Sequence, residues 1–132
     1  MAINIQMREG VMEAIFHGKV TGAELRQLLE TVQEMEARLE VTPDRISDLS
    51  DADLEELRSR DLVAFAERRG AAKLKNKVKS AIIAPGSTQY GLARMFLAHN
   101  ENPSISIMIF KDSASAYKWI GLEAKSVDRP NA

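Results

Sequence analysis

The stretch VKSAIIAPGSTQYGLARMFLAH, residues 78–99, decides the fold of this chain. Its apolar beginning predicts a strand, the Pro85-Gly86 pair ends that strand, and residues 89–98 have the pattern of a helix. The same order returns in residues 104–121, where the strand-like SISIMIF is followed by a second helical segment. Strands that alternate with helices pair in parallel, because a parallel neighbour needs a long crossover connection. The sequence therefore predicts an α/β domain.

The N-terminal part supplies the rest of the predicted sheet. Residues 3–7 alternate apolar and polar side chains, and with residues 11–17 they predict an antiparallel hairpin. A capping-box pattern at Thr21 and Glu24 then starts a long helix. Its buried face is expected to hold Leu25, Leu28, Leu29 and Val32. A short strand at 44–49 and a helical region at 53–75 complete the order β-β-α-β-α-β-α-β-α.

The predicted strands have one polar and one apolar side. In residues 104–109, isoleucine at 105, 107 and 109 alternates with Ser104, Ser106 and Met108, whereas the central strands of a doubly wound sheet are apolar on both faces. We therefore predict a single mixed sheet of about five strands, with an antiparallel hairpin followed by parallel strands. About four helices should lie mainly on one face, wound as a β-α superhelix. The domain is expected to span residues 1–126, with a flexible tail at 127–132.

The composition is that of an ordinary water-soluble domain. The chain has 132 residues, of which 45% are hydrophobic and 28% are charged, enough for one domain with a real core. Its formal net charge of −1 gives no general attraction to nucleic acid or to an anionic membrane. It has no cysteine, no signal-peptide pattern and no apolar run near the ~18 residues of a membrane span. These features predict a cytoplasmic protein without a transmembrane segment or a nucleic-acid partner.

Residue types that carry catalysis or bind metals are sparse. The two histidines, His17 and His99, have no metal-binding spacing. The acidic residues within 48–56 lack the glycine-containing pattern of a cation-binding loop. No serine stands in a nucleophile elbow. We therefore expect no metal, no cofactor and no enzymatic activity.

One helix face presents a candidate binding group. Tyr90 and Arg94 lie four residues apart on the predicted helix 89–98, so they share a face. Arg94 stands in an apolar stretch and must reach water or find a carboxylate, for which Asp48 is the natural partner. Two interpretations stay open. Asp48 and Arg94 form a structural bridge, or they bind a ligand together with Tyr90 and Phe96.

The two repeated strands predict a second surface. If helices cover only one face of the sheet, the side chains that point to the other face form a contiguous apolar patch. Its members are Ala81, Ile83, Met108 and Phe110. Monomers seldom leave such a patch exposed, so we expect a homodimer or another protein partner there.

Five segments carry a family resemblance. They are RISDLS, FAERR, AIIA, YGLARMF and IFKD, at residues 45–50, 65–69, 81–84, 90–96 and 109–112, followed by Ala116 and Trp119. Together with the element order, they resemble the STAS domain of anti-sigma-factor antagonists, which has the SpoIIAA-like fold. The segments are most similar to an uncharacterised bacterial branch that is sometimes grouped with CRAL-TRIO-like lipid-binding proteins. The resemblance implies a bacterial, non-enzymatic regulatory domain.

One family feature is altered here. STAS antagonists carry a phosphorylatable serine in an Asp-Ser-(Ser/Ala)-Gly-like turn after the third strand, whereas this chain reads DLSDAD at residues 48–53. Ser50 and Ser59 lie near the corresponding place, and neither stands in that motif. They are the candidate phosphorylation positions.

Three functions follow from these observations. The leading hypothesis is a STAS-like regulatory or protein-interaction module that forms a homodimer. The alternative is a carrier or sensor of a small apolar or lipid-like ligand, bound between helices near Tyr90, Arg94 and Phe96. An unrecognised enzyme ranks third. An apolar cavity favours the carrier, a flat apolar patch favours the interaction module, and a carboxylate pair in a cleft favours the enzyme.

Overall fold

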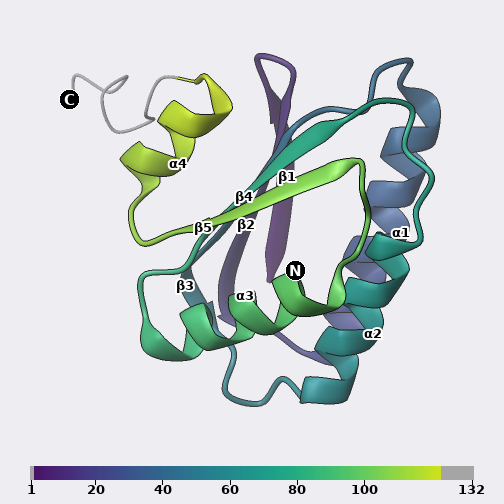
Figure 1. The fold of residues 1–132 in the computed structure, drawn as a ribbon. Coiled ribbons are helices and arrows are strands. Elements are labelled where there is room, and N and C mark those ends of the chain that lie inside the picture. Colours follow the sequence, from purple (N-terminus) through teal and green to yellow (C-terminus); the bar gives the residue numbers. More distant parts are fainter. Residues whose placement is uncertain (1, 123–132) are drawn as a thin grey trace.

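The computed structural model describes residues 2–122, and within them a five-stranded sheet is flanked by four helices (Figure 1). In chain order the elements are β1 (Ile3–Arg8), β2 (Val11–Lys19), α1 (Gly22–Arg38), β3 (Arg45–Asp53), α2 (Ser59–Gly70), β4 (Val78–Ile83), α3 (Ser87–His99), β5 (Ile105–Phe110) and α4 (Ser113–Ile120). The strand order is β1-β2-β3-β4-β5, with β1 and β2 antiparallel and the later neighbours parallel. The mixed α/β sheet expected from the sequence is confirmed, and the predicted tail at 127–132 lies outside the described residues.

The N-terminal hairpin closes through a two-residue turn. Arg8 pairs with Val11, and the intervening Glu9 and Gly10 have φ of 50° and 81°. Positive φ at both central positions is the type I′ geometry whose twist matches that of the flanking strands. Glycine adopts it freely, whereas Glu9 is an unusual residue at positive φ.

Helix α1 begins and packs as the sequence predicts. The Thr21 hydroxyl accepts a hydrogen bond from the Glu24 amide at 3.3 Å, and the Glu24 carboxylate accepts one from the Thr21 amide at 2.9 Å. The predicted apolar face is buried against the sheet, at Leu25, Leu28, Leu29 and Val32. The capping box and the apolar stripe therefore fix where this helix starts and which side it buries.

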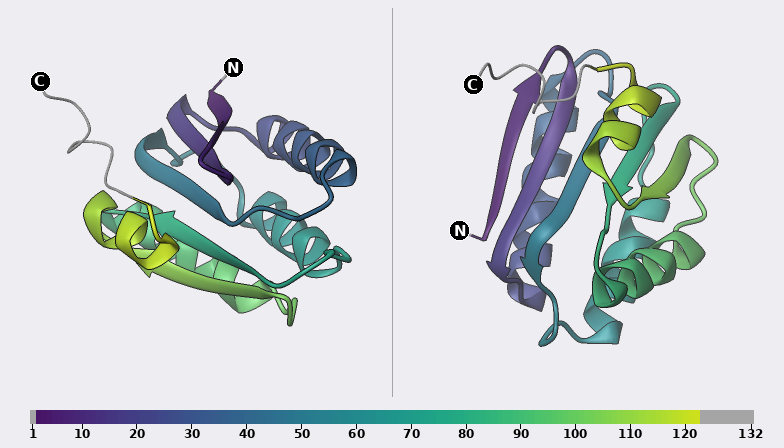
Figure 2. Two further views of the ribbon diagram at one scale, coloured as in Figure 1. Left: turned by 90° about the horizontal axis from the view of Figure 1, so that it is seen from above. Right: turned by 90° about the vertical axis from the view of Figure 1, so that its left-hand side faces the viewer.

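Three helices lie on one face of the sheet and the fourth on the other. In the right-hand view of Figure 2, α1 runs behind the strands and α4 lies in front of them. Helices α1, α2 and α3 each connect two parallel neighbours, and successive right-handed connections in one direction place them on the same face. Within residues 2–122, helix α4 follows the last strand and connects to no further strand, so this rule does not constrain its side.

The third strand is longer than its apolar residues indicate. It runs from Arg45 to Asp53, and its acidic end pairs with β2, with Asp51 opposite His17 and Asp53 opposite Lys19. The predicted strand end at residue 49 and the predicted helix start at residue 53 are corrected, because residues 51–53 pair with β2 as part of the strand. Helix α2 starts instead at Ser59, with Arg58 in the capping position.

Candidate functional site

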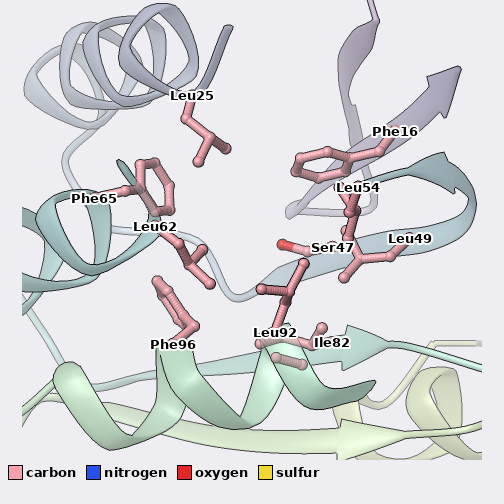
Figure 3. A pocket seen from close by; sticks show the side chains of 11 residues that line it. Phe16, Leu25, Ser47, Leu49, Leu54, Leu62, Phe65, Ile82, Leu92 and Phe96 are labelled. Atoms are coloured by element: carbon pink, nitrogen blue, oxygen red, sulfur yellow. The ribbon is translucent and has the colours of Figure 1, made fainter. Parts of the chain in front are cut away.

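An apolar cavity of about 70 Å³ lies between the sheet and helices α1, α2 and α3 (Figure 3). It is lined by Phe16, Leu25, Ser47, Leu49, Leu54, Leu62, Phe65, Ile82, Leu92, Ala93 and Phe96. Every lining side chain except Ser47 is apolar, and the Ser47 hydroxyl points into the space (Figure 3). The cavity therefore suits an apolar group and offers it one hydrogen-bonding partner.

The periodicity of the elements brings this lining together. Alternate residues of β3 face the helices, which places Ser47 and Leu49 on the cavity side. On α3, Ala93 and Phe96 share a helical face, and the small side chain of Ala93 leaves space beside the sheet. The ring of Phe96 meets that of Phe65 from α2 at a centroid distance of 5.8 Å.

The cavity is not sealed from solvent. Phe65 on α2 and both Leu92 and Phe96 on α3 keep part of their surface exposed, as does Ser47 on β3. These lining residues come from separate elements, so access depends on how closely α2 and α3 pack.

Of the helix residues proposed as a binding group, only Phe96 lines this cavity. Arg94 is exposed, and its guanidinium carbon lies 5.9 Å from the centre of the Tyr90 ring. The Lys111 ammonium lies 5.0 Å from the same ring. Tyr90 itself packs against the main core and is partly buried. Tyr90 and Arg94 therefore share a face as expected, and that face presents two cations around one aromatic ring.

The structure does not bring Asp48 to Arg94. Ile46 on β3 packs against α4, and by strand alternation Asp48 faces the same side. Helix α3, which carries Arg94, packs on the opposite side of the sheet. The Asp48 carboxylate instead accepts a hydrogen bond from the Ser50 amide at 2.9 Å. The sheet separates the two residues, so the bridge interpretation is corrected.

The patch predicted on the helix-free face is covered by the chain itself. Ala81 and Ile83 are buried beneath α4, where they contact Ala116 and Tyr117. Phe110 packs on Trp119 at a ring distance of 5.8 Å. Only Met108, on the edge strand, stays 45% exposed. The expectation of an open four-residue surface is therefore corrected, because the last helix buries most of it.

The two candidate phosphorylation positions are both exposed. Ser50 lies within β3, and its carbonyl accepts a 3.4 Å hydrogen bond from the Gln89 side chain. Ser59 is the first residue of α2. Neither lies in a turn that leads from the third strand directly into a helix. Phosphorylation of either serine stays a prediction.

A buried carboxylate, missed by the sequence analysis, lies on the α4 side of the sheet. The Glu13 side chain is 1% exposed and accepts hydrogen bonds from Gln6 at 2.6 Å and from Arg8 at 3.4 Å. The Tyr117 hydroxyl on α4 bonds the same carboxylate, and the Arg8 guanidinium lies 5.3 Å from the Tyr117 ring. Burial, aided by Glu13, raises the pKa of Tyr117 to about 12. The sequence feature that could have indicated this buried carboxylate is the single charged residue in the apolar run VMEAIF, residues 11–16.

A second buried ion pair joins α1 to α2. Both terminal nitrogens of Arg69 donate to the Glu36 carboxylate, at 2.9 and 3.0 Å, and the Arg69 side chain is 1% exposed. Its Nε atom is buried and has no hydrogen-bond partner among the residues that the structure describes. Burial and the neighbouring Arg69 charge lower the pKa of Arg45. The burial of this arginine could have been expected from its helical spacing with three apolar residues, which places it on the buried face. They are Leu62, Phe65 and Ala66, and the arginine is Arg69.

Neither polar cluster resembles a metal centre. Across residues 2–122, no three His, Asp or Glu side chains are grouped closely enough to hold a metal ion. Among the helices of the same range, none has the length and apolar character that a membrane crossing requires. The site that stands out within the described chain is the apolar cavity.

The chain begins with an antiparallel hairpin and continues with parallel strands whose three connecting helices lie on one face of the sheet. This arrangement is that of a SpoIIAA-like domain. Among solved structures, the chain is similar to an uncharacterized protein of the DUF3478 family with a SpoIIAA-like fold from Shewanella loihica PV-4. The TM-score is 0.59 at 20% identity, over 90% of this chain and 92% of that chain. No protein-family model matches the sequence, and no curated protein is similar to it. The fold implied by the segment resemblance is thus confirmed.

Proposed function

We propose that this protein is a non-catalytic, SpoIIAA-like regulatory module of the bacterial cytoplasm that binds a small apolar or lipid-like ligand in the cavity behind α2 and α3. The observation that supports this function is the cavity lining, in which Ser47 is the one polar residue. Such a lining favours an apolar body with at most one hydrogen-bonding group. Of the hypotheses drawn from the sequence, the carrier or sensor is the one that an apolar cavity favours.

The volume of the cavity limits what it holds. An engineered cavity of about 150 Å³ accommodates benzene, whereas this one measures about 70 Å³. A short unbranched apolar group fits the space as it stands. A longer ligand requires α2 and α3 to separate at the Phe65–Phe96 contact, which would change the surface of both helices. Ligand binding would thereby be coupled to a change in shape, as a sensor requires.

The side chains around the cavity support binding rather than catalysis. General acid–base chemistry needs a titratable group beside the reacting atom, and the lining provides a single serine hydroxyl. The buried carboxylate of Glu13 lies on the opposite face of the sheet, where Gln6 and Arg8 already bond it. A carboxylate pair in a cleft, which would favour an enzyme, is not part of this cavity.

The test is to fill the cavity and measure binding of a defined probe. Ala93→Leu places a larger side chain into the space, whereas Ala98→Leu makes the same change on an exposed position of the same helix. We expect 1-butanol and 1-octanol to shift the NMR methyl signals of Leu62 and Ile82 in the parent and in Ala98→Leu. The apparent affinity of the Ala93→Leu variant for both alcohols, taken from these shifts, should be at least tenfold lower than that of the parent. Equal binding by both variants, or no shift in the parent, would refute the proposal.

A second candidate function is association with protein partners, including a second copy of the chain. It is favoured by Met108, a large apolar side chain that is 45% exposed on the edge strand β5. Large exposed apolar side chains are ordinary when scattered, and they gain meaning when they adjoin an open sheet edge. Such association would fit the regulatory role proposed for a STAS-like module.

A further inference from the structure

A groove of about 90 Å³ lies between α1 and α2 and adjoins the apolar cavity. Leu25 from α1 and Phe65 from α2 line both hollows, so the groove and the cavity meet at this pair of side chains. Figure 3 shows the two side chains at the side of the cavity where α1 and α2 lie. Phe65 keeps part of its surface exposed, whereas Leu25 is buried. A molecule in the cavity that extends past these two side chains therefore enters the α1–α2 groove.

The lining of the α1–α2 groove carries charge, unlike the lining of the cavity. Arg26 on α1 and Arg68 on α2 line the groove from its two sides, together with the carboxylate of Asp61. Both arginines are exposed, and neither guanidinium group forms an ion pair or a hydrogen bond with another residue of the range 2–122. The apolar cavity therefore continues into a hollow in which positive charge exceeds negative charge.

The Asp61 carboxylate lies against the first turn of α1. A Cβ atom at Gly22 would stand 2.5 Å from Oδ2 of Asp61, so the absence of a side chain at position 22 allows the carboxylate to lie this close. Gly22 is the first residue of α1, where free backbone amides and the helix dipole favour a negative charge. Arg26 lies about one turn further along α1, and Arg68 lies about two turns beyond Asp61 along α2. The start of α1 therefore stabilises Asp61, and the two arginines are left for a ligand.

We propose that the ligand of this protein is an unbranched apolar chain that ends in a carboxylate, such as a fatty acid, with its chain in the cavity and its carboxylate between Arg26 and Arg68. This inference rests on the proposed function, because it assigns the polar end of the ligand held in the same cavity. Guanidinium groups bind carboxylates through paired, charge-assisted hydrogen bonds. Two arginines against one aspartate leave a single excess positive charge, which a carboxylate balances, whereas a phosphate monoester carries about −1.5 to −2 at pH 7.

Two probes with chains of the same length test the carboxylate site. Octanoate and 1-octanol differ in the group at the end of the chain, and only octanoate is charged at neutral pH. The NMR methyl signals of Leu62 and Ile82 report the affinity of the cavity for each probe. We expect the parent to bind octanoate about tenfold more tightly than 1-octanol, because charge-assisted hydrogen bonds are the stronger ones. The side-chain Nε–H signals of Arg26 and Arg68 should shift with octanoate and stay in place with 1-octanol.

Two double variants separate the proposed site from a general effect of charge. Arg26→Gln combined with Arg68→Gln should reduce the preference for octanoate over 1-octanol to about twofold or less, because both cations of the groove are lost. Arg38→Gln combined with Arg60→Gln is the control. It removes the same charge from exposed positions of α1 and α2 that line neither hollow, so the preference should stay at the level of the parent.

Three results would overturn the carboxylate site. The first is a parent that binds 1-octanol as tightly as octanoate, which would leave the cavity function standing. The second is a control variant that loses the preference as fully as the variant of Arg26 and Arg68. The third is tighter binding of octyl phosphate than of octanoate by the parent. A parent that binds none of the three probes would refute the cavity function and this proposal together.

Discussion

Replacing Glu36 with glutamine tests how α1 and α2 are held together. The change keeps the size of the side chain and removes the charge that both terminal nitrogens of Arg69 contact at 2.9 and 3.0 Å. Arg69 is 1% exposed, so its charge would stay buried without a counter-ion. The Nε atom has no hydrogen-bond partner within residues 2–122, and the nearby charge of Arg45 adds repulsion. Every one of these effects lowers the stability of the folded state.

The magnitude follows from the burial of the pair. Removing one partner of a buried ion pair costs about 3–5 kcal/mol, because the remaining charge is desolvated without compensation. Glu36 is 14% exposed, so water screens the pair only slightly. Domains of this size have about 5–15 kcal/mol of net stability, so the loss is a large fraction of the total. We expect Glu36→Gln to lose about 3 kcal/mol.

Urea unfolding followed by circular dichroism measures this loss. Glu34→Gln is the matched control, because it removes the same charge from an exposed position of α1 and should stay within about 0.5 kcal/mol of the parent. The double variant Glu36→Leu with Arg69→Met should lose less than Glu36→Gln, since it leaves no buried charge behind. A Glu36→Gln variant as stable as the Glu34→Gln control would refute the reasoning.

Two further predictions concern the core and the α4 side of the sheet. Leu28→Ala should cost roughly 2–5 kcal/mol in urea unfolding, because this α1 side chain is 2% exposed, and a loss below about 0.5 kcal/mol would make the helix peripheral. Burial raises the pKa of Tyr117 to about 12, so the stability that its neutral form contributes is complete below pH 10 and is lost as the pH rises toward 12. In Tyr90→Phe, where Tyr117 is the remaining tyrosine, the ultraviolet absorbance of tyrosinate should therefore rise near pH 12. A midpoint near pH 10 would contradict the burial of this hydroxyl.

The strongest local patterns predicted the fold correctly. The capping box at Thr21 and the apolar stripe behind it set the position of α1, and the alternation in residues 3–7 set the hairpin. The capping box lies within a few residues, and the apolar stripe and the alternation repeat at the period of the helix or strand that they predict. The parallel order of the later strands followed from their alternation with helices.

The side on which α4 packs could not be derived in the same way. The crossover rule places a helix only when a strand follows it in the sheet, and no strand follows α4 within the described residues. Its apolar face, including Ala116 and Tyr117, had two possible surfaces to cover. A protein partner was expected to cover Ala81 and Ile83, and the chain's own last helix covers them instead.

The candidate site was only partly predictable, because it depends on residues that are distant in the sequence. Glu36 and Arg69 are 33 positions apart, and Glu13 meets a tyrosine on the last helix. A cavity is the volume left between side chains from α1, α2, α3 and the sheet, so no single segment encodes it. Phe96 was identified through its helix, whereas Ser47 carried no signal of its own.

Native mass spectrometry of the protein purified from its own host would show whether the cavity behind α2 and α3 holds a small apolar ligand. We expect an additional mass that organic solvent releases as a small apolar molecule. The Ala98→Leu control should retain that mass and the cavity-filling Ala93→Leu variant should lack it. A parent protein with the mass of its chain alone, or an additional mass that Ala93→Leu retains in full, would show that this cavity does not hold such a ligand.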